Sequence, residues 1–431
     1  MKKIIIPLIL GVIVSLYFFP IGLTFLPSSI NTKMLLGVAG IVFFAIECIR
    51  NKSVHFSKEI FWSALIALAF SLSCYYSVVS NNTDDTSYAG YFMSYAVWLG
   101  GAYAVIMTLK LYHGSVTIDV LARYLLWVGV GQCISVLLID NIPAFSDFVD
   151  RFMEIGQAHV REMNRLYGIG SALDPAGVRF SVILVLTAHY VCTYVIKNGT
   201  AVNLAICIIA FLFIVMVGNM VSRTTTVGAL LGLGYLALYL VRVEKGVMHA
   251  STLKAMVTVG VVVAVAVPVV TILYNTNENM HDNLRFAFEG FFNWVEQGEW
   301  RTDSTDKLNT VMWVWPEDTR TWIIGSGLFN GFIFSTDIGY CRFILYCGLL
   351  GFSLFCALFI YCSYTVLDRF ENSWLLALLL LALVFAIWVK VATDIFLIFA
   401  LLMCTDPDGE EDDEDDEEEE AVVETMETES A

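Results

Sequence analysis

The fold is decided by a pattern that is clearest at residues 201–241, which read AVNLAICIIAFLFIVMVGNMVSRTTTVGALLGLGYLALYLV. Two apolar stretches, at 201–218 and 224–241, flank a short polar turn around Arg223. A helix that crosses a membrane needs about 20 mostly apolar residues, because its backbone polar groups must all be hydrogen-bonded internally. Both stretches approach that length. The sequence therefore predicts two membrane-spanning helices joined at Arg223.

The same pattern recurs along most of the chain. Comparable stretches lie at 4–25, 33–49, 60–79, 88–109, 118–139, 175–196, 253–273 and 339–366. The apolar segment 374–403 is too long for one ordinary span, and Lys390 and Asp394 interrupt it, so we divide it into helices at 374–388 and 391–404. The predicted fold class is all-α: a polytopic integral membrane protein with about 12 transmembrane helices and a large outer loop. Eleven spans are the main alternative.

Composition excludes two other classes of protein. Leu and Ile occur in blocks without apolar/polar alternation, which excludes an outer-membrane β-barrel. A hydrophobic fraction of 58% excludes a soluble globular protein. The first stretch has no small-x-small cleavage site and more spans follow it, so we expect it to be retained rather than removed as a signal peptide.

The short connections between the stretches give the orientation. The short outer loop 80–87 carries only Asp84 and Asp85. With a cytoplasmic N-terminus, the inner connections carry Arg50, Lys52, Lys58, Lys110, Lys197, Arg242, Lys245, Lys254 and Arg369. This is the distribution that the positive-inside rule requires. We therefore expect both termini in the cytoplasm, and large outer loops at 140–174 and 274–336.

The end of the chain differs in kind from the rest. Residues 405–431 contain 16 acids and neither Lys nor Arg, which leaves 25 acids against 24 bases in residues 1–404. Chains of this composition stay solvated instead of burying a core. We expect a membrane domain at 1–404 and a disordered, acidic cytoplasmic tail at 405–431, most simply without a specific role.

Arginines and lysines sort to opposite sides in this topology. Eight of the 11 lysines lie inside, and nine of the 13 arginines lie at or just below the outer surface. These are Arg151, Arg161, Arg165, Arg179, Arg223, Arg285, Arg301, Arg320 and Arg342. A guanidinium grips phosphate oxygens with a planar fork of N–H donors. Pairing with nearby acids in a long loop is the simpler explanation for Arg151, Arg161, Arg165 and Arg301.

Three arginines fit that explanation poorly. Arg179, Arg223 and Arg342 each lie near the outer end of a predicted span, at similar depth. Arginine within a membrane is costly and usually marks a site or a paired charge, and helix N-termini also favour anions. We interpret the three as an anion site. Snorkelling to lipid headgroups, or pairing of Asp337 with Arg342, would explain one or two of them without function.

The outer loops hold two further patterns. Five of the ten tryptophans lie between Trp294 and Trp322, where they are equally suited to stacking on sugar rings and to an interfacial belt. The stretch Phe145–Leu166 has aromatic residues at helical spacing and predicts an amphipathic helix on the membrane surface.

Several short motifs resemble a known family. Met220–Leu230 (MVSRTTTVGAL) resembles the Ser-Arg segment of the O-antigen polymerase/ligase family, bacterial membrane enzymes that transfer glycans from undecaprenyl-pyrophosphate carriers. Trp322–Gly327, Thr336–Arg342 and Gly348–Gly351 resemble the end of that family's large periplasmic loop and its next helix, and Lys390 near Asp394 resembles its C-terminal pattern. The resemblance covers most of residues 165–404, in order and in topology.

The resemblance implies an inverting, metal-independent glycosyltransferase of the bacterial inner membrane, with its active site facing the periplasm. It implies no cofactor. Its implied partners are an undecaprenyl-pyrophosphate-linked oligosaccharide, a glycan acceptor, the lipid bilayer and, for a polymerase, a chain-length regulator. By motif, Arg223 and Arg342 would bind the leaving diphosphate with Arg179 beside them, and Arg320 of the large loop is a fourth candidate.

The acceptor hydroxyl needs a base, and three residues are candidates. His281 is the only histidine of the large loop, and Glu289 and Asp337 are the carboxylates that we consider. The sequence contains no metal-ligand motif and no basic, aromatic-interleaved surface for nucleic acid. Three functions remain open: a polymerase of lipid-linked repeat units, a ligase that moves glycan to another acceptor, and a transporter or flippase for lipid-linked saccharide.

Overall fold

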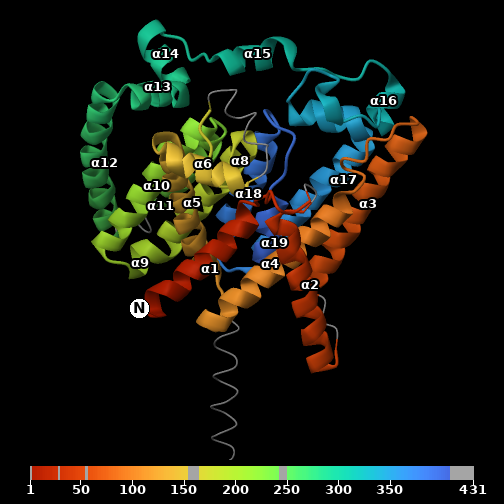
Figure 1. Cartoon of the computed structure of the whole chain (residues 1–431), viewed down its shortest axis with the longest axis horizontal. Helices are drawn as coiled ribbons and strands as arrows, with labels where there is room; N and C mark the ends of the chain where they lie inside the picture. Colours follow the sequence, from red (N-terminus) through yellow and green to blue (C-terminus); the bar gives the residue numbers. More distant parts are fainter. Residues whose placement is uncertain (1, 28–29, 54–56, 154–164, 242–249, 408–431) are drawn as a thin grey trace, which may run out of the picture.

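The computed structural model describes all residues except 1, 28–29, 54–56, 154–164, 242–249 and 408–431. The chain folds as a bundle of helices (Figure 1), and in the described residues β-structure is limited to isolated bridges. Within the described residues, eight helices are long and apolar enough to cross a membrane. The prediction of an all-α, multi-pass membrane protein is thus confirmed at this level.

Each predicted apolar stretch contains a helix, although the first helix ends at Phe18 rather than near residue 25. The long helices are α2 (Thr32–Asn51), α3 (Lys58–Ser80), α4 (Tyr91–His113), α5 (Ile118–Asn141), α8 (Leu173–Tyr190), α10 (Ala201–Val221), α12 (Ala250–Thr276) and α17 (Gly339–Arg369). After α8, a π-helical turn (Val191–Val195) and α9 (Ile196–Asn198) complete one long apolar rod. Shorter apolar helices are α1 (Lys2–Phe18), α11 (Thr225–Val241), α18 (Trp374–Ile387) and α19 (Phe396–Cys404).

The last expected helix differs from the prediction. It begins at Phe396 rather than at residue 391, because Asp394 accepts a hydrogen bond from the backbone N–H of Phe396 at 2.9 Å and so starts the helix there. Residues 388–395 form a non-helical stretch, which we call the α18–α19 connection. Helix α19 has nine residues, so it rises about 14 Å, less than half of the ~30 Å hydrocarbon core.

Of the eight candidate spans in the described residues, the one that contains α8 (Leu173–Asn198) is the most deeply buried. Close glycine contacts bring α11 against it. A Cβ atom on Gly228 would lie 2.1 Å from the Cα of Ser181, and one on Gly177 would lie 2.7 Å from the Oγ of Ser222. These contacts fix the α10–α11 turn, Ser222–Thr224, against the first turns of α8.

The segment between α12 and α17 forms a layer across one end of the bundle (Figure 1). It contains α13 (Glu278–Ala287), α14 (Glu289–Gln297), α15 (Asp303–Val311), α16 (Thr319–Ile324) and a 3₁₀ turn (Asn330–Phe332). Leu284 and Ala287 of α13 are buried in one cluster with Met220 of α10. The layer is thereby packed onto the end of α10, next to the α10–α11 turn.

Helix α6 (Pro143–Phe152) occupies the first part of the expected amphipathic stretch. Phe145 and Val149 pack against Ile139 and Tyr167, whereas Phe148 and Phe152 are exposed. The aromatic spacing therefore predicted a helix here, but it placed Phe145, Phe148 and Phe152 on one face, whereas Phe145 packs inward and the other two are exposed. Residues 154–164, which complete the predicted stretch, lie outside the described residues.

Helix α17 is interrupted at Gly348, whose φ of +65° is in the left-handed region. The interruption frees backbone carbonyls: Leu345 accepts from the N–H of Ser326 at 2.7 Å, and Tyr346 accepts from that of Gly327 at 3.0 Å. A Cβ atom on Gly348 would lie 2.3 Å from the carbonyl oxygen of Ile323. Glycine is required because no side chain fits this approach.

The tail begins anchored to the bundle. Asp406 forms an ion pair with Lys110 and accepts the backbone N–H of Val116 at 2.8 Å. Arg369 donates to the carbonyl of Thr405 at 2.6 Å, and Thr405 is buried. The rest of the predicted disordered tail, from residue 408, lies outside the described residues.

Candidate functional site

Asp174, in the first turn of α8, holds the turn that presents Arg223. Its Oδ1 atom accepts hydrogen bonds from Ser222 Oγ at 2.7 Å and from Thr224 Oγ1 at 2.9 Å, the residues on either side of Arg223. Lys390 of the α18–α19 connection places its Nζ atom 3.4 Å from the same oxygen. One carboxylate therefore ties together α8, the α10–α11 turn and the α18–α19 connection.

The Arg223 side chain points into the layer. Its guanidinium forms an ion pair with Glu289, at the start of α14, and both side chains are largely buried, with exposures of 17% and 23%. The guanidinium also lies 4.5 Å from the ring centre of Phe286. The second oxygen of Glu289 accepts the backbone N–H of Asp303 at 3.1 Å. Arg223 thus connects the apolar bundle to the polar layer.

Arg165 approaches the same aromatic ring. Its guanidinium lies 5.5 Å from the ring centre of Phe286, so Phe286 is in contact with two cations. Arg165 also lines a cavity of about 510 Å³ between α5, α6 and α13, whose other polar groups include Asn279, Asp282 and Asn283. The sequence interpretation had assigned Arg165 to ordinary loop pairing, and the shared ring indicates a place beside Arg223 instead.

Arg342 lies one turn into α17. It donates to the carbonyl of Phe329 at 2.8 Å, and its guanidinium lies 4.0 Å from the centre of that residue's ring. Asp85 holds this loop in place by accepting the backbone N–H groups of Phe329 and Asn330, each at 2.6 Å. Thus Asp85, noted in the sequence only for its charge, positions the contact partner of Arg342.

Asp337 lies just before α17, within electrostatic range of Arg342, Asp174 and Lys390. Its side chain reaches solvent, yet the surrounding protein partly desolvates the carboxyl and raises its pKa above the ordinary value, an effect that Arg342 opposes. A carboxyl with a raised pKa holds a proton more readily than an ordinary aspartate.

Arg179 is one and a half turns into α8. It lies in the electrostatic field of the carboxylate of Asp394, which Lys33 of α2 also reaches. Arg179 and Asp394 line a small cavity of about 80 Å³ together with Trp98 and Pro175.

Each of the three arginines, or the turn that presents it, is linked to the α18–α19 connection through one or two residues, which we call its intermediary. For Arg179 the intermediary is Asp394, which belongs to the connection, and for the Arg223 turn it is the pair of Asp174 with Lys390. For Arg342 it is Tyr88, which lies within electrostatic range of Arg342 and Asp394 and donates to the carbonyl of Ala392 at 3.3 Å. The α18–α19 connection therefore adjoins the segments that carry the three arginines, whereas the Arg223 guanidinium itself pairs with Glu289 in the layer.

Two sequence candidates are engaged elsewhere. Arg320 of α16 donates to the carbonyl of Ser80 at the end of α3, at 2.6 Å. His281 of α13 stacks on Tyr274, with ring centres 4.2 Å apart, and its Nδ1 lies 3.3 Å from the Tyr274 carbonyl oxygen. The structure therefore brings together Arg223 with Glu289 and Arg342 with Asp337, and it gives Arg320 and His281 separate partners.

The described residues contain no group of three or more His, Cys, Asp or Glu side chains arranged to hold a metal ion. The site is instead built from arginine, lysine and carboxylate groups around the α18–α19 connection. Such groups bind anions and move protons. Comparison with family models, with curated proteins and with solved structures finds no match for this chain.

Proposed function

We propose that this chain is a polymerase that joins undecaprenyl-pyrophosphate-linked oligosaccharide repeat units into a surface polysaccharide, O-antigen or capsule, at the periplasmic face of the bacterial inner membrane. One observation carries the proposal: Arg179, the turn that presents Arg223, and Tyr88 beside Arg342 each adjoin the α18–α19 connection, at the end of the bundle next to the layer. That arrangement suits a lipid-linked oligosaccharide: its diphosphate would lie near the arginines, its lipid tail in the membrane and its glycan in water.

The proposed topology has twelve spans and places both termini in the cytoplasm. The eight long helices together with α1, α11 and α18 account for eleven spans. The α18–α19 connection together with α19 accounts for the twelfth. Lys110 and Arg369, which contact the start of the acidic tail, then lie on the cytoplasmic side, as the positive-inside rule favours. The layer of α13–α16 becomes the large periplasmic loop.

In the proposed reaction, a sugar hydroxyl of the acceptor attacks the anomeric carbon of the lipid-linked donor from the face opposite the diphosphate. The carbon–oxygen bond to the diphosphate breaks, and undecaprenyl diphosphate leaves with the bonding electron pair. Arg223 and Arg342 stabilise the negative charge that develops on the phosphate oxygens, with Arg179 beside them. Losing one positioned donor of this kind typically lowers the rate by about 10²–10³.

Asp337 is our preferred base for the acceptor proton. Glu289 is occupied by Arg223 and by the N–H of Asp303, and the Nδ1 of His281 faces the carbonyl of Tyr274. The carboxyl of Asp337 lies near Arg342 and has a raised pKa, which makes it a stronger proton acceptor than an ordinary aspartate. General-base assistance contributes about 10²–10⁴ in rate.

The experiment replaces Arg223 and Arg342, singly, with Lys and with Gln in cells that depend on this protein for polysaccharide. Arg301→Gln is the matched control, because Arg301 is exposed and pairs with its near neighbours in the chain, Glu299 at 3.4 Å and Asp306 at 2.7 Å. We expect the control to make long chains, and the Arg223 and Arg342 variants to lose them and to accumulate single carrier-linked repeat units. Long chains of normal abundance in both Gln variants, at normal protein levels, would contradict the proposal.

One observation favours a second candidate, a transporter or flippase for lipid-linked saccharide. Such proteins bind substrate at interrupted helices with buried charges, and this chain has an interruption at Gly348 and a charged connection after α18. The same variants separate the two functions. A polymerase defect leaves carrier-linked repeat units exposed to the periplasm, where an added glycosidase digests them, whereas a flippase defect leaves them protected in the cytoplasmic leaflet.

A further inference from the structure

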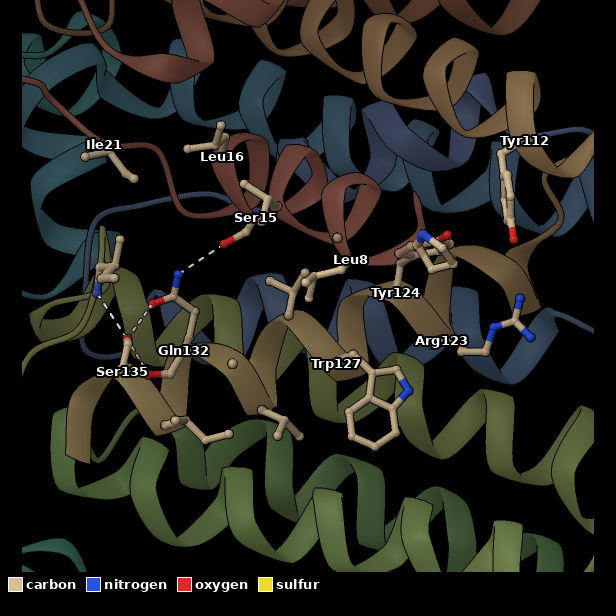
Figure 2. Close-up of a pocket in the computed structure, with 18 of the residues that line it drawn as sticks. Leu8, Ser15, Leu16, Ile21, Tyr112, Arg123, Tyr124, Trp127, Gln132 and Ser135 are labelled. Carbon is tan, nitrogen blue, oxygen red and sulfur yellow. Dashed lines mark hydrogen bonds between the residues drawn. The ribbon is translucent and has the colours of Figure 1, made fainter. Parts of the chain in front are cut away.

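A long apolar groove lies between α1 and α5, away from the arginine site (Figure 2). Its volume is about 910 Å³, near the upper end of the ~300–1,000 Å³ range of ligand pockets. Glycines open it: Gly11 of α1 and Gly131 of α5 both line the groove, and a Cβ atom on either would meet nothing within 4 Å.

The two ends of the groove differ in chemistry. At one end lie Tyr112 and Arg123 (Figure 2), next to the helix ends that hold the start of the tail. Toward the other end, Gln132 of α5 donates to Ser15 of α1 at 3.2 Å. Ser135 donates to the Oε1 atom of Gln132 at 3.4 Å. These side chains are uncharged, so this part of the groove offers no charge to a ligand.

Arg123 is exposed at its end of the groove, and none of the ion pairs of the described residues includes it. Asp119, one turn earlier on α5, accepts a hydrogen bond from Thr193 at 3.3 Å. Trp127, one turn later, is 52% exposed and lines the groove. The Arg123 guanidinium therefore lies at the open end of the groove, beside the Trp127 side chain.

The length of the groove matches one leaflet of a bilayer. From Arg123 to Gln132, α5 rises about 14 Å, and half of the hydrocarbon core is about 15 Å thick. No water is present at that depth to fill an apolar groove, so a hydrocarbon chain is the natural occupant. A cation at the headgroup level attracts an anionic lipid.

We propose that this groove binds one anionic glycerophospholipid of the cytoplasmic leaflet, with an acyl chain along Gly11 and Gly131 and its phosphate at Arg123. The orientation rests on the topology proposed above, but the site is separate from the arginine site and does not require the polymerase activity. A carrier polyprenyl diphosphate fits less well, because its phosphates belong at the periplasmic end, where the groove lining provides no cation.

The test uses the full-length protein, delipidated in detergent and titrated with phosphatidylglycerol or with phosphatidylcholine of the same acyl chains. Bound lipid is counted by native mass spectrometry. Gly131→Leu fills the groove, and Gly234→Leu is its control, because a Cβ atom on Gly234 of α11 also meets nothing within 4 Å. Arg123→Gln removes the charge, and Arg50→Gln removes an exposed charge in the last turn of α2.

We expect the wild-type protein to bind one phosphatidylglycerol more tightly than phosphatidylcholine. Gly131→Leu should weaken both lipids about tenfold or more, and Arg123→Gln should abolish the preference for phosphatidylglycerol, while both control variants behave as the wild type. Equal binding by Gly131→Leu and Gly234→Leu overturns the site, and an intact preference in Arg123→Gln overturns the headgroup assignment. Displacement of phosphatidylglycerol by equimolar undecaprenyl phosphate assigns the groove to the carrier and also overturns the proposal. Normal polysaccharide in Gly131→Leu cells leaves the proposed function intact.

Discussion

Lys390 lies 3.4 Å from Asp174, and this ion pair joins the connection after α18 to the turn that presents Arg223. Asp174 also accepts the hydroxyls of Ser222 and Thr224. Its carboxylate therefore holds the side chains on both sides of Arg223 while it pairs with a cation of the connection. The first prediction concerns this group.

Asp174→Ala should destabilise the protein by about 3 kcal/mol, because it leaves Lys390 without its partner and two hydroxyls without their acceptor. Asp174→Asn should recover part of that loss, since an amide oxygen still accepts hydrogen bonds. Thermal unfolding in detergent measures both. Asp306→Ala is the control, because its partner Arg301 is 62% exposed and such pairs contribute about 0–1 kcal/mol. Equal effects of Asp174→Ala and Asp306→Ala would refute a central role for Asp174.

Exchanging the residues of the Arg223–Glu289 ion pair distinguishes a role of Arg223 in stability from a role in the reaction. Arg223→Glu alone should destabilise the protein by roughly 2 kcal/mol by placing two carboxylates together. The double variant Arg223→Glu with Glu289→Arg should regain stability but not polysaccharide, because the cation then stands on α14 instead of at the α10–α11 turn. Thermal unfolding and polysaccharide chain length, measured for the wild type, the single variant and the double variant, test this. Recovered polymerisation in the double variant would show that Arg223 serves only as an ion-pair partner.

The raised pKa of Asp337 gives a pH prediction. A base works only when it is deprotonated, so the rate should fall as the pH falls toward the pKa of Asp337, and this fall should begin at higher pH than for an ordinary aspartate. Lys390→Gln removes a cation that opposes the rise, so it should move the acidic limb to still higher pH. Rates in proteoliposomes measure the profile. An acidic limb that is unchanged in Asp337→Asn would assign the proton to another group.

Gly348 should be among the least replaceable residues of the bundle. Gly348→Ala places a Cβ atom 2.3 Å from the Ile323 carbonyl oxygen at a φ of +65°, so we expect a loss of more than about 2 kcal/mol in stability. Gly234→Ala, within α11 and in open space, should instead be neutral or stabilising by up to about 1 kcal/mol. Melting temperatures compare the two. Similar values would mean that α17 continues without an interruption at Gly348.

The acidic tail should be dispensable only beyond its anchor. Deletion of residues 408–431 should leave the melting temperature unchanged, whereas deletion of 405–431 should lower stability by about 1–3 kcal/mol, because it removes the contacts of Asp406 with Lys110 and Val116. Asp406→Asn should fall between the two. A similar melting temperature for both deletions would show that the anchor contributes nothing.

The sequence predicted the helices well because length and hydropathy decide where a chain becomes helical in a membrane. The two apolar stretches beside Arg223 are α10 and α11, and the charges Lys390 and Asp394 correctly marked an interruption. The start of α19 was wrong by five residues, because a local hydrogen bond from Phe396 to Asp394 decides it.

The site could be predicted only in part, for a physical reason. Arginines near helix ends are visible in a sequence, but their partners depend on packing: Glu289 meets Arg223 across 66 residues, and Ser222 meets Asp174 across 48. The roles of Asp174 and Asp85, and the place of Arg165 beside Phe286, had no local signal. Asp174 before Pro175, and Asp84 and Asp85 in a short loop, can each be explained without a functional site.

The most direct test of the account is the affinity of the purified protein in lipid nanodiscs for undecaprenyl diphosphate, measured for the wild type and for Arg223→Gln and Arg342→Gln, with Arg301→Gln as the control. If the guanidinium groups around the α18–α19 connection hold the diphosphate, each of the two site variants should bind about tenfold more weakly or worse, and the control should bind normally. Wild-type affinity in both site variants would contradict the account.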